Sequence, residues 1–241
     1  MTPGTFTGPL ALLDPAEWEA LWLSLQVSAA ATALVAGPGV ALGWLLARRD
    51  FRGKLLVDTL VHLPLVLTPV VIGYLLLLLL GRSGPLAPLL DALGLEVAFT
   101  TLGAVVAAAV VALPLVVRSV RTAVELVDPG LEDAAAVLGA GPWRRFRMVT
   151  LPLAAPGVVA GLTLGFARSL GEFGATITLA GSIAGETRTL PLAIFQSTQV
   201  PGGDGAALRL TVVSVLLSAA ALLASELVLR RLRRGAGGGR T

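Results

Sequence analysis

The sequence predicts an all-α integral membrane protein in which five helices cross the bilayer. Hydrophobic residues make up 55% of the 241 residues. They gather in uninterrupted runs of about 20 residues or more, the length that a helix needs to cross the hydrocarbon core. Neither half of the sequence has the composition of a soluble domain, so we expect one transmembrane domain over residues 1–241. The basic residues lie at the ends of the apolar runs, where they orient a membrane protein, and not along one soluble face that binds nucleic acid.

The five predicted crossings cover residues 21–47, 55–80, 99–117, 154–179 and 208–229. Pro64 and Pro69 in the second crossing, and Pro114 in the third, remove backbone donors and predict kinks. Kinked helices often line cavities, but lipid-facing kinks that neighbouring helices support fit the pattern equally well. After the fifth crossing, four arginines and a glycine-rich sequence predict a flexible basic tail over 230–241, anchored at anionic headgroups.

Lys and Arg are distributed unequally between the two sides of this arrangement. Segments 48–54, 118–153 and 230–241 fall on one side and contain fourteen of the 18 basic residues. The opposite side has three, and one more, Arg168, lies inside the fourth crossing. By the positive-inside rule, the N-terminus lies outside, while segment 118–153 and the C-terminus are cytoplasmic. The N-terminus has acidic residues and no basic cluster, so no cleavable signal peptide is predicted.

The connection from Asp128 to Pro152 predicts two short cytoplasmic helices joined at a glycine. Asp128 is a good N-cap, and Pro129 suits the first helical position because the amide proton that it lacks has no partner there. Acidic residues in the first turns favour the positive end of the helix dipole, and Gly139 is expected to end the helix. A second helix is expected to start at Gly141-Pro142 and to carry Trp143, Arg144, Arg145, Phe146 and Arg147.

The spacing within this connection resembles a known family signature. The sequence has Asp133-Ala134-Ala135, three further residues, Gly139, nine further residues, and then Val149-Thr150-Leu151-Pro152. Membrane subunits of binding-protein-dependent ABC importers have Glu-Ala-Ala, Gly and Ile-x-Leu-Pro at the same spacings. Asp replaces Glu here and Val replaces Ile, while the neighbouring Glu132 keeps a longer carboxylate available. The resemblance implies the five-helix transmembrane core of a type I ABC importer permease, with this segment as its cytoplasmic coupling helix. The alternative is an ordinary amphipathic surface loop.

The residues that the resemblance assigns to the contact with an ATPase subunit have small or charged side chains. Small side chains let a helix approach a partner closely, and Gly139 permits a sharp turn back to the membrane. The charged side chains can pair with groups on the partner, and the arginines can instead reach lipid headgroups. The expected contact residues are Glu132, Asp133, Ala134, Ala135, Gly139, Arg144 and Arg145.

A second stretch, Ala167–Phe195, is similar to the matching region of molybdate permeases, and sulfate and tungstate permeases have related sequences. The resemblance implies a non-catalytic subunit that translocates molybdate across the cytoplasmic membrane of a bacterium or archaeon. It also implies a homodimer, two ATPase subunits and a periplasmic or lipoprotein binding protein. No cofactor is expected in this chain, which has no Walker-type phosphate loop, so the ATPase would bind ATP and Mg. Sulfate, tungstate or another solute is the alternative substrate.

The fourth crossing has small residues at every fourth position, namely Gly157, Gly161, Gly165 and Ser169. In lipid, such a face lets two helices approach closely, so we expect helix packing there and not substrate contact.

Arg168 and Glu172 lie one helical turn apart near the end of the same crossing. A charge near the middle of the bilayer is costly, so Arg168 should face protein or water. One hypothesis is that Arg168 adds positive potential to the path of a divalent oxyanion and Glu172 holds it in place; the other is a structural ion pair. Gly171 and Gly174 indicate either a moving gate or simply the helix end. Thr176 is a candidate hydroxyl of the path, or it bonds back to its own helix.

Enzymatic and metal sites have little support in the sequence. There is no cysteine and a single histidine, His62, which lies one turn after Asp58. Two ligands are too few for a metal site, and Lys54 is placed to pair with Asp58. An intramembrane protease would need a Ser/His dyad at depth, whereas His62 is predicted near the cytoplasmic interface. An intramembrane enzyme is therefore a remote alternative.

Overall fold

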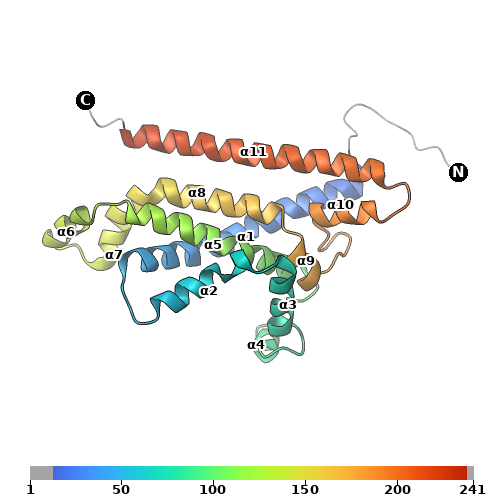
Figure 1. Cartoon of the computed structure of the whole chain (residues 1–241), viewed down its shortest axis with the longest axis horizontal. Helices are drawn as coiled ribbons and strands as arrows, with labels where there is room; N and C mark the ends of the chain where they lie inside the picture. The colour runs from blue at the N-terminus through green and yellow to red at the C-terminus, as the bar shows by residue number, and fades with distance from the viewer. Residues whose placement is uncertain (1–12, 238–241) are drawn as a thin grey trace.

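The computed structural model describes residues 13–237, and every regular element in this range is helical (Figure 1). The all-α prediction is confirmed for this part of the chain. The elements are α1 (Pro15–Arg48), α2 (Lys54–Val66), α3 (Pro69–Leu80), α4 (Ala87–Ala92), α5 (Thr101–Glu125), α6 (Pro129–Val137), α7 (Pro142–Arg145), the π-helical turn η1 (Phe146–Thr150), α8 (Leu151–Leu170), α9 (Gly174–Leu179), α10 (Leu190–Thr198) and α11 (Asp204–Gly237).

Helix α5 forms the centre of the molecule, and α1 and α8 pack closely against it. Close approach is possible because the neighbouring helices present glycines to α5. A Cβ atom added at Gly39 of α1 would lie 2.7 Å from Val116 Cγ1, and one added at Gly161 of α8 would lie 2.8 Å from Ser119 Cβ. Between helices in lipid, such van der Waals packing drives association. The predicted packing role of the small-residue face of the fourth crossing is confirmed.

The predicted second crossing, residues 55–80, is broken in the structure. Helices α2 and α3 meet at a bend of 116°, and Leu67 and Thr68 between them have extended backbone. Pro69 causes the break, because a residue before proline is pushed out of the α conformation. Helix α3 then runs across the other helices and leads to α4 (Figure 1). Pro114, in contrast, lies buried within an unbroken α5.

The predicted fourth crossing, residues 154–179, differs from the structure at both ends. Helices α7 and α8 and the turn η1 form one helix from Pro142 to Leu170, so the second short helix of the connection is not separate. The π turn lies just before Pro152, and the Leu151 amide donates to the Phe146 carbonyl five residues earlier. At the other end the helix stops at Leu170, and α9 begins only at Gly174.

The last helix continues further than predicted. Residues 230–237 were expected to be flexible, but they extend α11 to Gly237; residues 238–241 of the expected tail lie outside the described residues. Arginine is a good helix former, and Arg230 Nε also pairs with Glu226 Oε1 one turn earlier at 2.9 Å. In residues 13–237, four helices are long and apolar enough to cross a membrane, and α2 with α3 would make a fifth span.

The two ends of the bundle differ in the segments that they gather. The connection between α1 and α2, helices α6 and α7, and the end of α11 lie at one end of the molecule (Figure 1). These are the segments that the sequence groups on the basic side. At the opposite end, Arg209 of α11 pairs with the buried Glu17 of α1 at 2.7 Å, which ties the last helix to the first.

Candidate functional site

Helix α6 has the caps that the sequence predicts at both of its ends. The Oδ1 atom of Asp128 accepts a hydrogen bond from the Gly130 amide at 2.8 Å, and Pro129 is the first helical residue. Gly139 has φ +83°, a conformation that favours glycine. The amides of Gly139 and Ala140 donate to the carbonyls of Ala136 and Ala135, both at 2.9 Å. This pair of bonds is a Schellman motif, so local signals determine where α6 starts and stops.

No residue of α6 is buried. Asp133 and Ala134 are exposed, as a docking helix requires. Two large apolar side chains at its C-terminal end are also open to solvent, Val137 at 88% and Leu138 at 87% exposure. Neither residue was among the predicted contact residues, although their apolar character next to Gly139 is visible in the sequence. These two adjacent apolar side chains, next to the exposed Asp133 and Ala134, are candidates for contact with a partner.

Glu132 is held within the chain and does not face outward. Its Oε1 atom lies 3.1 Å from Arg48 Nε and accepts a hydrogen bond from Thr150 Oγ1 at 2.7 Å. Arg48 also donates to the Val127 carbonyl at 2.7 Å. Glu132 and Arg48 are only 18% and 14% exposed, so the pair is shielded from water. Glu132 therefore fastens α6 to α1 and η1, and Asp133 is the exposed carboxylate of the two. The contact of Glu132 with an ATPase subunit stays a prediction.

Aromatic side chains fasten the other arm of the connection. The Phe146 ring lies 5.5 Å from the rings of both Trp143 and Trp44, measured between centroids. Trp44 belongs to α1, so the start of the α7–α8 helix is anchored on the same helix as α6. Of the two arginines expected to contact a partner, Arg144 is exposed and Arg145 is partly buried.

Near the break between α8 and α9, the expected ion pair forms. Arg168 Nη1 lies 2.7 Å from Glu172 Oε2, and the other carboxylate oxygen of Glu172 accepts from the Ala175 amide at 2.9 Å. Glu172 is 3% exposed, whereas the Arg168 side chain is 34% exposed. The pair thus joins the end of α8 to the start of α9 across Gly171.

The other candidate path residues lie in different surroundings. A Cβ atom at Gly174 would lie 2.9 Å from Pro69 Cβ, so Gly174 seats α9 against the start of α3. Thr176 is 1% exposed and buried in this packing. Gly171, in contrast, has no atom within 4 Å of the position that a Cβ would take. The structure therefore pairs Arg168 with Glu172, whereas Gly174 and Thr176 are buried in the packing of α9.

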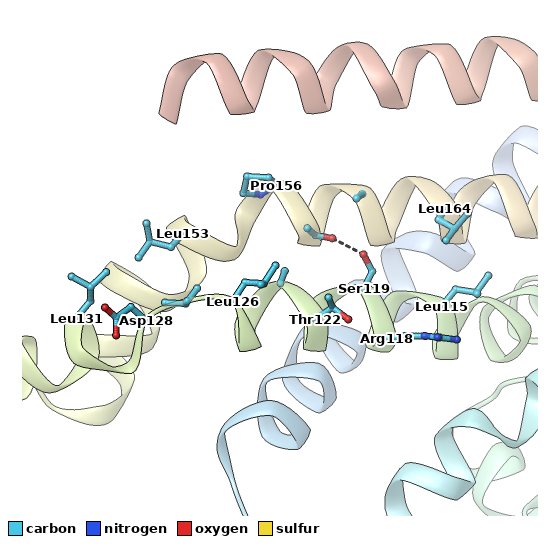
Figure 2. A pocket seen from close by; sticks show the side chains of 14 residues that line it. Leu115, Arg118, Ser119, Thr122, Leu126, Asp128, Leu131, Leu153, Pro156 and Leu164 are labelled. Carbon is cyan, nitrogen blue, oxygen red and sulfur yellow. Dashed lines mark hydrogen bonds between the residues drawn. The ribbon is translucent and has the colours of Figure 1, made fainter. Parts of the chain in front are cut away.

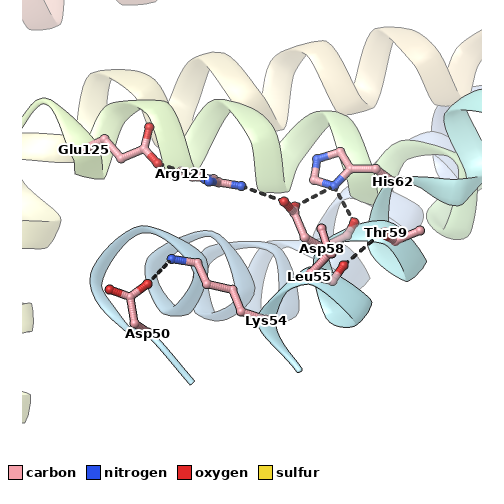
Figure 3. Close-up of polar contacts among 8 residues, drawn as sticks. All are labelled: Asp50, Lys54, Leu55, Asp58, Thr59, His62, Arg121 and Glu125. Atoms are coloured by element: carbon pink, nitrogen blue, oxygen red, sulfur yellow. Dashed lines mark hydrogen bonds and ion pairs between the residues drawn. The ribbon is translucent and has the colours of Figure 1, made fainter. Parts of the chain in front are cut away.

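A chain of charged side chains connects α2 with α5 (Figure 3). Arg121 Nη1 lies 3.0 Å from Asp58 Oδ2, and Arg121 Nε lies 2.9 Å from Glu125 Oε1. The His62 ring lies 3.1 Å from Asp58 Oδ1. These residues line a cavity of about 380 Å³ together with Thr59, Arg118 and Thr122. In residues 13–237 no group of three or more possible metal ligands occurs, and this cavity contains no serine to pair with His62.

The predicted pairing of Lys54 with Asp58 is wrong. Lys54 Nζ instead lies 2.8 Å from Asp50 Oδ1 (Figure 3), and this hydrogen bond lowers the pKa of the Asp50 carboxyl. Asp58 turns toward Arg121, which is distant in the sequence but adjacent in space. A pairing rule for residues one turn apart cannot find such a partner.

A second, larger cavity lies between α5 and α8 (Figure 2). Its volume is about 880 Å³, and its lining is mostly apolar. The Ser119 hydroxyl donates to the Gly157 carbonyl at 2.9 Å along the seam between the two helices. Arg118 and Thr122 line this cavity as well as the smaller one, so α5 borders both hollows.

Comparison with known sequences gives matches along almost the whole chain. The model of the family described as "binding-protein-dependent transport system inner membrane component" matches residues 39–234. The molybdenum transport system permease protein ModB of Escherichia coli (strain K12) is 51% identical over 229 residues, which are 95% of this chain and 100% of that protein. The sulfate transport system permease protein CysW of the same organism is 38% identical over 209 residues, 85% of this chain and 72% of that protein.

Comparison with solved structures confirms the fold. A chain of the methionine ABC transporter MetNI, in an inward-facing conformation, superposes with a TM-score of 0.70. The superposition covers 91% of this chain and 99% of that chain at 20% sequence identity. The helical arrangement described above is therefore that of an ABC importer permease.

Proposed function

The chain belongs to the family of binding-protein-dependent transport system inner membrane components, and on this premise we propose that it is the membrane-spanning subunit of an ATP-driven molybdate importer. The substrate is inferred from the 51% identity to a molybdenum transport permease over the full length of that protein. The coupling role is inferred from α6, an exposed helix that carries the family signature and is capped at both ends. The chain is a multi-pass membrane protein, and it serves in transport without a reaction of its own.

Helix α6 is the part that an ATPase subunit grips. Asp133, Ala134 and Ala135 form its polar and small-residue surface, while Val137 and Leu138 supply apolar contacts next to Gly139. Arg144 and Arg145 lie on the second arm and pair with acidic groups of the ATPase or with lipid headgroups. ATP and Mg bind to the ATPase partner, where hydrolysis occurs. Closure of the ATPase pair then moves α6, and the Glu132–Arg48 pair transfers this movement to α1.

Two copies of the chain enclose one path, because a single copy has few polar residues with which to line a channel. The N-terminus and α10 face the outside, where a binding protein delivers the anion, and α6 and the end of α11 face the cytoplasm. Transport proceeds by alternating access, in which the two copies rock against each other. Arg168 and Glu172, with Gly171, Gly174 and Thr176, belong to the region where α8 gives way to α9 and contribute to the gate.

Reconstitution of the chain with its ATPase and binding protein tests this function. ATP hydrolysis and uptake are measured with molybdate, tungstate, sulfate and phosphate as the offered anions. We expect molybdate and tungstate to stimulate hydrolysis and uptake, and phosphate to have no effect. Sulfate is the second candidate substrate because of the 38% identity to a sulfate permease. Stimulation by sulfate and not by molybdate would overturn the substrate while leaving the importer role intact; no association with any ATPase would overturn both.

A further inference from the structure

We infer that Arg118 of α5 is an anion-binding residue at the cytoplasmic end of the translocation path, where it takes a tetrahedral divalent oxyanion. The inference rests on the proposed function and names a residue of the path that the family signature does not contain. The burial of α5 is uneven along its length. Helix α5 is the central helix, and twelve of its 25 residues are buried, yet Arg118, Thr122 and Glu125 are exposed. These positions follow one another at helical spacing and form a polar stripe.

The depth of the stripe indicates what it faces. Arg118 lies seven residues before the end of α5, or roughly 10 Å along the helix at 1.5 Å per residue. Arg118 directly follows the predicted third crossing, residues 99–117, so its guanidinium belongs at the cytoplasmic edge of the bilayer, where water reaches it. Arg118 and Thr122 border both the large cavity between α5 and α8 and the smaller cavity between α2 and α5 (Figure 2). The stripe therefore faces hollows in the protein and not a packed helix.

Among the arginines that line the smaller cavity, Arg118 is the one without an ion-pair partner in the described residues. Arg121 has two carboxylate partners, Asp58 at 3.0 Å and Glu125 at 2.9 Å (Figure 3). Asp58 also accepts the contact from His62. Within residues 13–237, Arg118 forms neither an ion pair nor a side-chain hydrogen bond. Its five N–H donors are thus open to an acceptor-only ligand, and the exposed Thr122 hydroxyl lies one turn away.

In the proposed homodimer each copy contributes one Arg118, so two guanidinium groups are available to a divalent oxyanion. The neighbouring Asp58, Arg121 and Glu125 carry a net charge of −1, because two carboxylates share one guanidinium. This negative charge weakens the attraction for the anion and favours its release. Release into the cytoplasm is possible because the two cavities are open and water competes for the arginine. The site is therefore suited to weak, transient binding as the anion leaves.

The first test compares Arg118→Gln with Arg52→Gln in the reconstituted importer. Arg52 is an exposed arginine in the connection between α1 and α2, at the same end of the molecule, so the control removes the same charge from the same side. We expect Arg118→Gln to lower molybdate uptake at least about tenfold, the loss expected for one charge-assisted hydrogen bond. Assembly with the ATPase and basal ATP hydrolysis should remain, and Arg52→Gln should transport normally.

The absence of cysteine from the chain permits a second test that does not depend on tolerance of the glutamine variant. Arg118→Cys introduces a single thiol, which is treated with a cationic or a neutral thiosulfonate reagent of similar size. Uptake should recover with the cationic reagent and not with the neutral one, and molybdate should slow the labelling. The untreated and the treated parent protein, with the same ATPase, control for cysteines of the partner.

The outcomes separate this inference from the proposed function. Normal uptake by Arg118→Gln, or equal recovery with both reagents, overturns the role of Arg118 while the importer stands. If the parent protein takes up sulfate instead of molybdate and still depends on Arg118, the anion site stands and the substrate changes. If the parent protein transports no oxyanion, the proposed function fails and the inference fails with it.

Discussion

Helices α6 and α9 are both short, nine and six residues, but they differ completely in burial. No residue of α6 is buried, whereas four of the six residues of α9 are. The cap at Asp128 and the Schellman motif at Gly139 satisfy the ends of α6 locally, so it can stand away from the bundle. Helix α9 instead lies enclosed by α3 and α5. A helix whose ends are capped by its own residues can be exposed and available for docking of another protein. A helix enclosed by its neighbours instead contributes to the packing of the bundle.

The largest effect should come from disturbing the enclosed helix. Gly73 of α3 faces α9, and a Cβ atom there would lie 2.6 Å from the Ala175 carbonyl oxygen. Because a backbone atom cannot move aside cheaply, Gly73→Ala should lower the free energy of unfolding by about 3 kcal/mol. Thermal unfolding in detergent measures this loss of stability. Gly37→Ala is the matched control: Gly37 is also helical but has no neighbour within 4 Å, and the change should be neutral or slightly stabilising. Equal effects of both would mean that α3 and α9 do not pack as described.

The two adjacent carboxylates of α6 allow the second test. Glu132→Ala removes the partner of the shielded Arg48 and should cost about 2 kcal/mol of stability, the range for hydrogen bonds to charged groups. Asp133→Ala, one residue away on the exposed side, should leave the unfolding midpoint unchanged and weaken binding of the ATPase. Unfolding midpoints and copurification with the ATPase are measured for both variants. The reverse pattern would show that Glu132 and not Asp133 faces the partner.

A third test concerns the apolar end of the exposed helix. Replacement of both Val137 and Leu138 by Ser should weaken ATPase binding about tenfold, because it removes apolar surface that the contact would bury. The stability of the permease alone should not change, since both side chains are almost fully exposed in the structure. Surface-captured permease titrated with the ATPase measures the affinity. Unchanged affinity would restrict the contact to the polar face of α6.

The smallest effects are expected in the charged chain between α2 and α5. Arg121→Gln leaves Asp58 and Glu125 without their shared partner and should cost no more than about 1 kcal/mol, because all three side chains are partly exposed. Lys54→Gln breaks only the pair with the fully exposed Asp50 and should leave the unfolding midpoint unchanged. It should also return the Asp50 pKa toward its ordinary value, which titration followed by NMR can detect. A larger loss for Lys54→Gln would contradict this assignment of pairs.

Local features of the sequence predicted the parts of the structure that depend on neighbours along the chain. Asp128, Pro129 and Gly139 predicted both ends of α6, and the repeated glycines of the fourth crossing predicted its packing against α5. The Arg168–Glu172 pair was also predicted, because its members lie one turn apart.

Features that depend on distant residues were missed. Glu132 pairs with Arg48, and Asp58 pairs with Arg121, each far away in the sequence. The one-turn spacing rule therefore assigned Asp58 to Lys54 and could not find a partner within the chain for Glu132. The break at Pro69 was anticipated only as a kink, since its angle depends on how α3 packs on α9. The continuity of α7 with α8 was missed because Gly141-Pro142 predicts a start but not where the helix ends.

The single helix from Pro142 to Leu170 has a mechanical consequence. Its 29 residues make a rod of roughly 40 Å, anchored by aromatic rings at one tip and ending beside the Arg168–Glu172 pair at the other. A tilt of about five degrees of such a rod about one tip shifts the other tip by roughly 3.5 Å, and the π turn η1 near the Pro142 end is a place where the rod can bend. A displacement of the Pro142 end would thus be carried along this helix to the Arg168–Glu172 pair.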